Sequence, residues 1–78
     1  MKLIVLNLPR DFSQTDLAAL FEAYGDIKVC NLVMDEGTSG SKGFGFVNMA
    51  QQQDAEIAIE KLHGSKVGKN KIRVKVSN

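Results

Sequence analysis

The chain has 78 residues, 44% of them hydrophobic, and a formal net charge of +1. This length predicts a single small domain over residues 1–78 with one modest core, and the near-zero charge gives no overall attraction to nucleic acid. The one cysteine, Cys30, excludes an internal disulfide and a cysteine pair for a metal, and no apolar run is long enough to cross a membrane.

The charges are nevertheless separated along the chain. Residues 11–27 contain acids but no Lys or Arg, and residues 63–78 contain Lys and Arg but no acid. A nearly neutral domain with this distribution can still be basic on one side.

Residues 3–8, Leu-Ile-Val-Leu-Asn-Leu, form an apolar, β-favouring run that is closed by Pro9 and predicts the first strand. The run is apolar on both faces. That pattern suits a central strand with a helix on one side and a functional surface on the other.

A first helix is expected to start at Ser13, whose hydroxyl can cap it together with Asp16. Gly25 is expected to end it as a left-handed cap. The apolar stripe of this helix, at spacing i, i+3, i+4 and i+7, is Leu17, Leu20, Phe21 and Tyr24.

Residues 27–34 predict a second strand. Ile27 and Cys30 differ in parity, so both can face the core only if a local irregularity near Val29 resets the alternation. Asn31 and Val33 then lie on the outer face, and Cys30 is expected to be a buried, reduced thiol. The polar residues 35–41 predict a flexible hairpin loop, since they lack the lysine and helix spacing of a phosphate-binding loop.

Residues 42–49, Lys-Gly-Phe-Gly-Phe-Val-Asn-Met, predict a strand with two different faces. Val47 and Met49 point to a core. Phe44 and Phe46 share the opposite parity with Lys42 and Asn48, which are costly to bury, so this face is expected to meet water. Two exposed rings there form a platform for flat ligands; the alternative is an apolar strand whose rings lie under a helix or a partner.

A second helix is expected to begin at Asp54 or a nearby Gln and to end at Gly64, with His63 as a solvated last-turn residue. Residues 71–76 alternate as a fourth strand whose cations, Arg73 and Lys75, face away from the core. The stripe of the second helix repeats the spacing of the first and consists of Ala55, Ala58, Ile59 and Leu62.

The octamer at 42–49 resembles the RNA recognition motif family, matching its Lys/Arg-Gly-Phe/Tyr-Gly/Ala-Phe-Val-x-Phe/Tyr pattern except at Met49. Residues 3–8 sit where the second, six-residue motif of the family belongs, with Ile4 at a position that is usually aromatic. The resemblance spans essentially the whole chain. It implies stacking of bases on Phe44 and Phe46 and a phosphate contact to Lys42.

Strand-helix-strand occurs twice, which predicts an α+β, ferredoxin-like β-α-β-β-α-β fold: an antiparallel four-stranded sheet of order 4-1-3-2 with both helices on one face. The open face is then expected to bind single-stranded RNA, with single-stranded DNA as a further possible ligand, in a monomer without cofactor or metal. The expected RNA-binding residues are Lys2, Ile4, Leu6, Asn31, Lys42, Phe44, Phe46, Asn48, Arg73, Lys75 and Asn78.

The apolar residues on the same face leave a second hypothesis, a protein-interaction module that binds an apolar peptide or a partner domain. An acylphosphatase-like enzyme is rejected, because Arg10 follows Pro9 without a glycine-rich cradle, and no catalytic residue is assigned. The absence of a signal-peptide pattern makes the cytoplasm the expected compartment, or the nucleus in a eukaryote.

Overall fold

In the computed structural model we describe residues 1–34 and 41–77, without the side chains of Met34, Ser41 and Lys42. The expected loop at 35–41 therefore lies almost entirely outside the described residues. The elements, in chain order, are β1 (Lys2–Leu6), α1 (Gln14–Glu22), β2 (Ile27–Met34), β3 (Ser41–Met49), α2 (Gln52–Leu62), β4 (Lys66–Val67), β5 (Asn70–Lys71) and β6 (Arg73–Val76).

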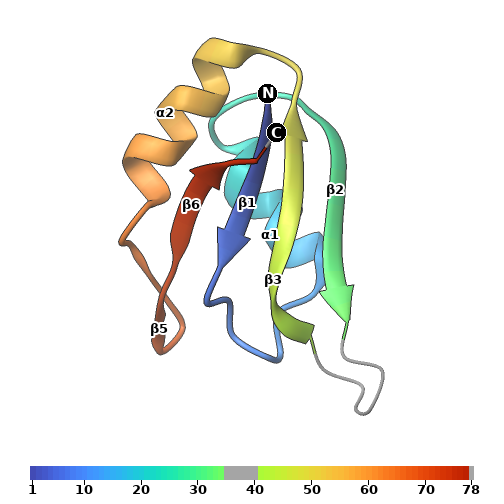
Figure 1. Ribbon diagram of the computed structural model, residues 1–78, viewed down its shortest axis with the longest axis vertical. Coiled ribbons are helices and arrows are strands. Elements are labelled where there is room, and N and C mark those ends of the chain that lie inside the picture. Colours follow the sequence, from blue (N-terminus) through green and yellow to red (C-terminus); the bar gives the residue numbers. More distant parts are fainter. Residues whose placement is uncertain (35–40, 78) are drawn as a thin grey trace.

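Four of the strands form an antiparallel sheet of order β2-β3-β1-β6 (Figure 1). Because β6 is the fourth strand of the predicted plan, this is the order 4-1-3-2, and the ferredoxin-like fold is confirmed. The two central strands are the apolar run and the glycine-phenylalanine octamer, as their sequences indicated.

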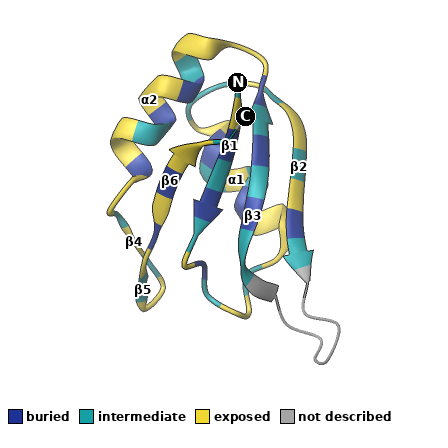
Figure 2. Ribbon diagram, viewed as in Figure 1, coloured by how far each residue is buried: buried dark blue, intermediate teal, exposed yellow. Residues whose placement is uncertain are grey.

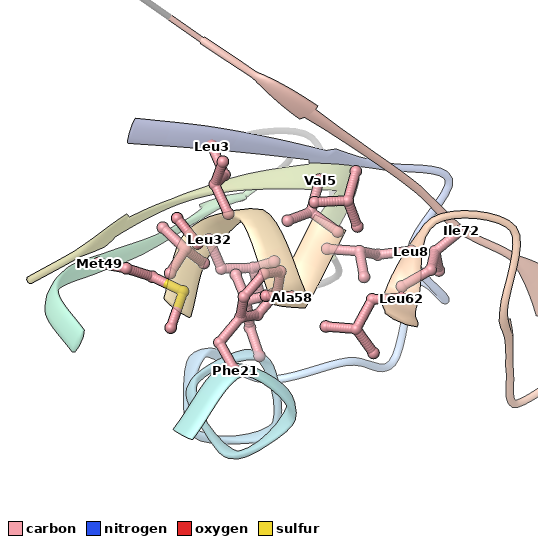
Figure 3. Close-up of a cluster of buried hydrophobic side chains, with 13 residues drawn as sticks. Leu3, Val5, Leu8, Phe21, Leu32, Met49, Ala58, Leu62 and Ile72 are labelled. Atoms are coloured by element: carbon pink, nitrogen blue, oxygen red, sulfur yellow. The ribbon is translucent and has the colours of Figure 1, made fainter. Parts of the chain in front are cut away.

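The core lies between the sheet and the two helices, which cover the same face. Leu3 and Val5 point from β1 toward Phe21 of α1 and Ala58 of α2 (Figure 3), and all four side chains are fully buried. Burial alternates residue by residue along β1 and β3 (Figure 2), so the opposite side chains of both strands are left on the uncovered face.

The expected irregularity in β2 is present. Ile27 is paired with Met49 and Val29 with Asn48, so the register shifts between them and Lys28 has no partner in β3. This bulge lets Ile27 and Cys30 both pack against the core despite their different parity. Val29 and Asn31 are exposed on the other side.

The ends of α1 were predicted only in part. Ser13 accepts a hydrogen bond from the Asp16 N–H at 3.0 Å, and the Asp16 carboxylate accepts one from the Ser13 N–H at 3.1 Å, which completes a capping box. The left-handed cap at Gly25 is wrong, because the helix ends at Glu22 and the φ of Gly25 is 159°. Glycine is needed there for space, since a Cβ would overlap the side chain of Asp54.

The C-terminal third contains a hairpin that the alternation did not indicate. Lys71 was expected to begin the last sheet strand, but it pairs with Lys66 in the two-stranded sheet β4-β5. The buried Ile72 separates this hairpin from β6. The uninterrupted polar-apolar pattern of residues 71–76 concealed the change of partner.

His63 is exposed, as expected, but it also supports the fold. Its Nδ1 accepts a hydrogen bond from the Val74 N–H at 3.1 Å. Because β6 is an edge strand, this bond satisfies a backbone donor that the sheet leaves unpaired.

Close packing of α1 on the sheet depends on Gly45, and we predict that Gly45→Ala destabilises the fold by about 1–3 kcal/mol. A Cβ on Gly45 would lie 2.8 Å from both the Asn31 carbonyl oxygen and Leu17 Cδ2. The backbone contact cannot relax by a rotamer change, so this crowding outweighs the ~0.5–1 kcal/mol by which Ala is otherwise favoured over Gly. Urea unfolding measures the difference, and an unchanged or raised free energy of unfolding would contradict the packing described.

Candidate nucleic-acid interface

The uncovered face of the sheet is organised in cross-strand rows. In the central row, Phe46 of β3 lies between Asn31 of β2 and Ile4 of β1, and Ile4 is paired in turn with Lys75 of β6. Side chains directly opposite each other on one face of an antiparallel pair have Cβ atoms about 5 Å apart. An aromatic ring and an aliphatic side chain are thus flanked by an amide on one side and a cation on the other.

The neighbouring rows follow from the same register. One contains Phe44, Leu6 and Arg73, and the other contains Val29, Asn48 and Lys2. We call the residues of the three rows the open face: Lys2, Ile4, Leu6, Val29, Asn31, Phe44, Phe46, Asn48, Arg73 and Lys75.

Exposure differs systematically across this face. The central side chains, among them Phe44, Phe46 and Ile4, are half-buried, whereas the flanking Asn31 and Lys75 are exposed. The rings therefore rest against their neighbours and present only part of their surface to solvent. This is less exposure than the sequence pattern suggested for Phe44 and Phe46.

The two rings that the sequence predicts as a platform for flat ligands are not coplanar. The ring centroids of Phe44 and Phe46 are 6.1 Å apart, but the ring planes are inclined by 87° in an edge-to-face pair. This geometry is favoured by the aromatic quadrupole. A planar ligand parallel to one ring is perpendicular to the other, so the rings offer two distinct surfaces.

Lys2 interacts directly with the aromatic pair. Its Nζ lies 4.9 Å from the centroid of the Phe46 ring, within the range of a cation–π interaction. The sequence placed Lys2 only at the edge of the binding surface. The structure places it over the ring.

A hollow of about 210 Å³ lies beside Phe46 and is lined by Lys2, Val29, Asn31, Phe46 and Asn48. It combines an aromatic wall, an aliphatic wall, two amides and an ammonium group. Val29 is not among the site residues predicted from the sequence. The signal was available, since the bulge expected near Val29 also turns its side chain toward the open face.

Among the described residues, the open face carries cations and no acid, whereas the helices on the covered side carry most of their charge as acids, together with the exposed Lys61. The open face carries Lys2, Arg73 and Lys75, all exposed. The exposed acids of the helices, Asp16, Glu22, Glu56 and Glu60, lie on the covered side of the sheet. The asymmetry that the charge distribution predicted is therefore present in the fold.

Two of the expected site residues cannot be placed on this face by their side chains. The backbone of Lys42 belongs to β3, but its side chain and Asn78 lie outside the described residues. Their contacts with RNA stay predictions from the sequence.

The chemistry of other kinds of site is limited. No group of three or more His, Cys, Asp or Glu side chains within residues 1–34 and 41–77 could hold a metal ion. Of the two described helices, neither is long and apolar enough to cross a membrane.

Burial, and secondarily the charge of Glu22, raises the pKa of the half-buried Cys30 thiol. Its Sγ lies 3.8 Å from the Gln14 carbonyl oxygen, so the thiol acts as a protonated packing group.

Comparisons with known proteins agree with this geometry. The family model for the RNA recognition motif matches residues 3–73. The sex determination protein fox-1 of Caenorhabditis elegans is 44% identical over 73 residues, which are 94% of this chain but only 17% of that protein.

Solved structures show the same similarity. A Sxl-lethal protein/RNA complex superposes with a TM-score of 0.91 at 35% identity, over 99% of this chain and 46% of that one. The RNA binding protein PG1 superposes with a TM-score of 0.90 at 36% identity, over 96% of this chain and 90% of that one.

The location of Phe46 on the open face predicts how its loss affects stability. We expect Phe46→Ala to lower the free energy of unfolding by no more than about 2 kcal/mol, because the ring is half-buried and its row faces solvent. Phe21→Ala is the matched comparison, since Phe21 is fully buried in the core and its loss is expected to cost about 3–5 kcal/mol. Chemical denaturation of both variants gives the two values, and equal losses would mean that Phe46 is a core residue.

Proposed function

This chain belongs to the RNA recognition motif family, and we propose that it binds single-stranded RNA across its open face. The observation that carries the proposal is the central row, in which Phe46 lies between the amide of Asn31 and the side chains of Ile4 and Lys75. A ring for stacking, an amide for a base edge and a cation for a phosphate are the three groups that a single-stranded nucleotide can use together.

Single-stranded RNA fits this surface better than a duplex. The open face is a sheet surface with hollows and no protruding helix or loop among its residues. In an A-form duplex the faces of the bases are covered by the neighbouring base pairs, whereas unpaired bases can stack flat on exposed rings. The solved protein/RNA complex with the same fold supports the same ligand class for this chain.

A base that stacks on the Lys2 side of the Phe46 ring must first displace the ammonium group. The cation–π interaction of an exposed lysine is worth about 0.5–1 kcal/mol, whereas stacking of a base on an aromatic side chain is worth about 1–3 kcal/mol. The exchange therefore favours the base. Lys2 then lies beside the bound nucleotide, where its charge can pair with a phosphate.

Because the two rings are perpendicular, Phe44 and Phe46 have different roles in the proposed site. One ring stacks on a base, and the other takes either a second base at a different inclination or the sugar of the same strand. Asn31 and Asn48 line the hollow beside Phe46 and are positioned to hydrogen-bond to the edge of the base. We assign this surface a binding role in a monomer, without catalysis.

An apolar peptide is the second candidate ligand, because Ile4, Leu6 and Val29 contribute aliphatic surface to the open face. The exposed cations and amides around these residues oppose it, since they must lose water without gaining partners on an apolar ligand. The tests below distinguish the two ligands.

Removing the Phe46 ring is expected to weaken binding to an unstructured, fluorescently labelled RNA by about 5- to 100-fold, the equivalent of one lost stacking contact. Fluorescence anisotropy measures the dissociation constants of wild type and Phe46→Ala. Ile57→Ala is the control, since Ile57 is an exposed hydrophobic residue, at 45%, on α2 away from the open face. Loss of binding in both variants, or in neither, would contradict the proposal.

We also predict that Ile4→Phe strengthens RNA binding. Ile4 is the direct neighbour of Phe46 in β1 and is half-buried on the open face, so a ring there adds a stacking surface without crowding the core. The gain is expected to reach about 5- to 100-fold, or less if the new ring leans on Phe46, with stability changed by no more than ~1 kcal/mol. Paired titrations with one RNA measure it. Weaker binding by a folded variant would instead indicate a pocket shaped for an aliphatic group.

A further inference from the structure

The hollow beside Phe46 is lined by polar groups of two kinds. Asn31 and Asn48 each carry a carbonyl oxygen and an amino group, so either amide can turn an acceptor or a donor toward a ligand. Lys2 carries only donors. Among the described residues that line the hollow there is no carboxylate to offer a fixed acceptor. The hydrogen-bonding character of Lys2 is therefore fixed, whereas that of the two amides is not.

Lys2 is held close to the place that a stacked base would take. Its backbone is paired with Asn48, in the row next to Phe46, and its Nζ lies 4.9 Å from the centroid of the Phe46 ring. A base that stacks on this side of the ring pushes the ammonium group aside. The side chain of Lys2 remains anchored in β1, and its flexible four-carbon stem lets Nζ stay beside the base. The displaced ammonium group then lies at the edge of the base instead of over the ring.

The apolar wall of the hollow limits how a base can be oriented. Asn48 is paired with Lys2 on one side and with Val29 on the other. Val29 is 48% exposed, and its side chain offers no hydrogen-bond partner. A polar atom of a base that faced Val29 would lose water without gaining a partner. We therefore expect the polar edge of the base to turn toward Lys2 and Asn48.

The four bases differ in what they present to an ammonium group. Uracil and guanine carry an exocyclic carbonyl oxygen, whereas cytosine and adenine carry an exocyclic amino group in the corresponding place. The oxygen accepts a hydrogen bond from Nζ. An amino group would bring donor against donor, so Lys2 would have to turn into solvent. Because an ammonium group has three N–H donors, a bond to the base leaves others for a phosphate.

From these observations we propose that the hollow beside Phe46 selects a keto base, uracil or guanine, over an amino base, and that Lys2 makes the selection. Lys2 donates a hydrogen bond to the exocyclic carbonyl oxygen of the stacked base. Asn31 and Asn48 turn their amides to match the rest of its edge. This inference rests on the proposed function and names the class of base that is bound at that site.

Uracil and cytosine give the sharpest test, because they are pyrimidines of the same size that present an oxygen and an amino group at the same ring position. Labelled oligomers of about six uridines and of about six cytidines are titrated at neutral pH by fluorescence anisotropy into wild type, Lys2→Met and Lys2→Arg. Met removes the ammonium group but keeps an unbranched side chain, and Arg keeps a charged donor. Thermal unfolding checks that each variant is folded.

Lys75→Met is the matched control. Lys75 is an exposed cation of the open face, but it is not among the residues that line the hollow. Its loss is expected to weaken the binding of both oligomers by a similar factor, because a contact to phosphate does not depend on the base. The ratio of the two dissociation constants should therefore stay at its wild-type value.

Wild type is expected to bind the uridine oligomer about three- to tenfold more tightly than the cytidine oligomer, the effect of one hydrogen bond. Lys2→Met is expected to bring the two dissociation constants within about twofold of each other, mainly by weakening the binding of uridine. Lys2→Arg is expected to keep the preference, since the guanidinium also donates to a carbonyl oxygen.

Two results would overturn the selection by Lys2. Equal wild-type affinity for the two oligomers, or tighter binding of cytidine, would mean that the hollow does not favour a keto base. Equal losses on both oligomers in Lys2→Met, with the ratio preserved, would mean that Lys2 contacts only phosphates. Failure of the proposed function gives a different result, because wild type would then bind neither oligomer.

Discussion

The register between β1 and β3 is the constraint on which the rest of the structure depends. Leu3 opposite Val47 and Val5 opposite Gly45 bury the core side of the two central strands, and the same register places Ile4 opposite Phe46 and Leu6 opposite Phe44 on the open face. A slip of one residue would turn the whole set over, exposing the core side chains and burying Lys2 and Asn48. Hydrophobic burial on one side therefore fixes the arrangement of the binding groups on the other.

Apolar side chains on the open face stay partly exposed to water, and their exposed surface contributes nothing to the stability of the fold. Phe44, Phe46, Ile4 and Leu6 are only half-buried, while Lys2, Arg73 and Lys75 surround them with charge. The edge-to-face contact of the rings and the cation over Phe46 reduce the exposed apolar surface in the free protein. Both interactions are weaker than base stacking, so they hold the site in order without blocking it.

The sequence predicted what depends on alternation and spacing. Local alternation and spacing indicated the face on which Phe44 and Phe46 lie, the bulge before Val29 and the capping box at Ser13. The order of the sheet followed from the repeated strand-helix-strand pattern. It did not predict the hairpin β4-β5, because Lys71 and Arg73 continue one alternating pattern across a change of partner. Three contacts could not be predicted from residue spacing, because they depend on side-chain rotamers and on segments that are distant in the sequence. They are the perpendicular rings, the position of Lys2 over Phe46 and the hydrogen bond from Val74 to His63.

The central claim is that this register presents an RNA-binding surface on the open side of the sheet. Its most direct test is an NMR titration of the uniformly ¹⁵N-labelled protein with a short, unstructured single-stranded RNA. We expect the largest amide shift changes in β1, in residues 43–48 of β3 and in β6, with α1 and α2 nearly unchanged. Shift changes confined to the two helices, or none at saturating RNA, would contradict it.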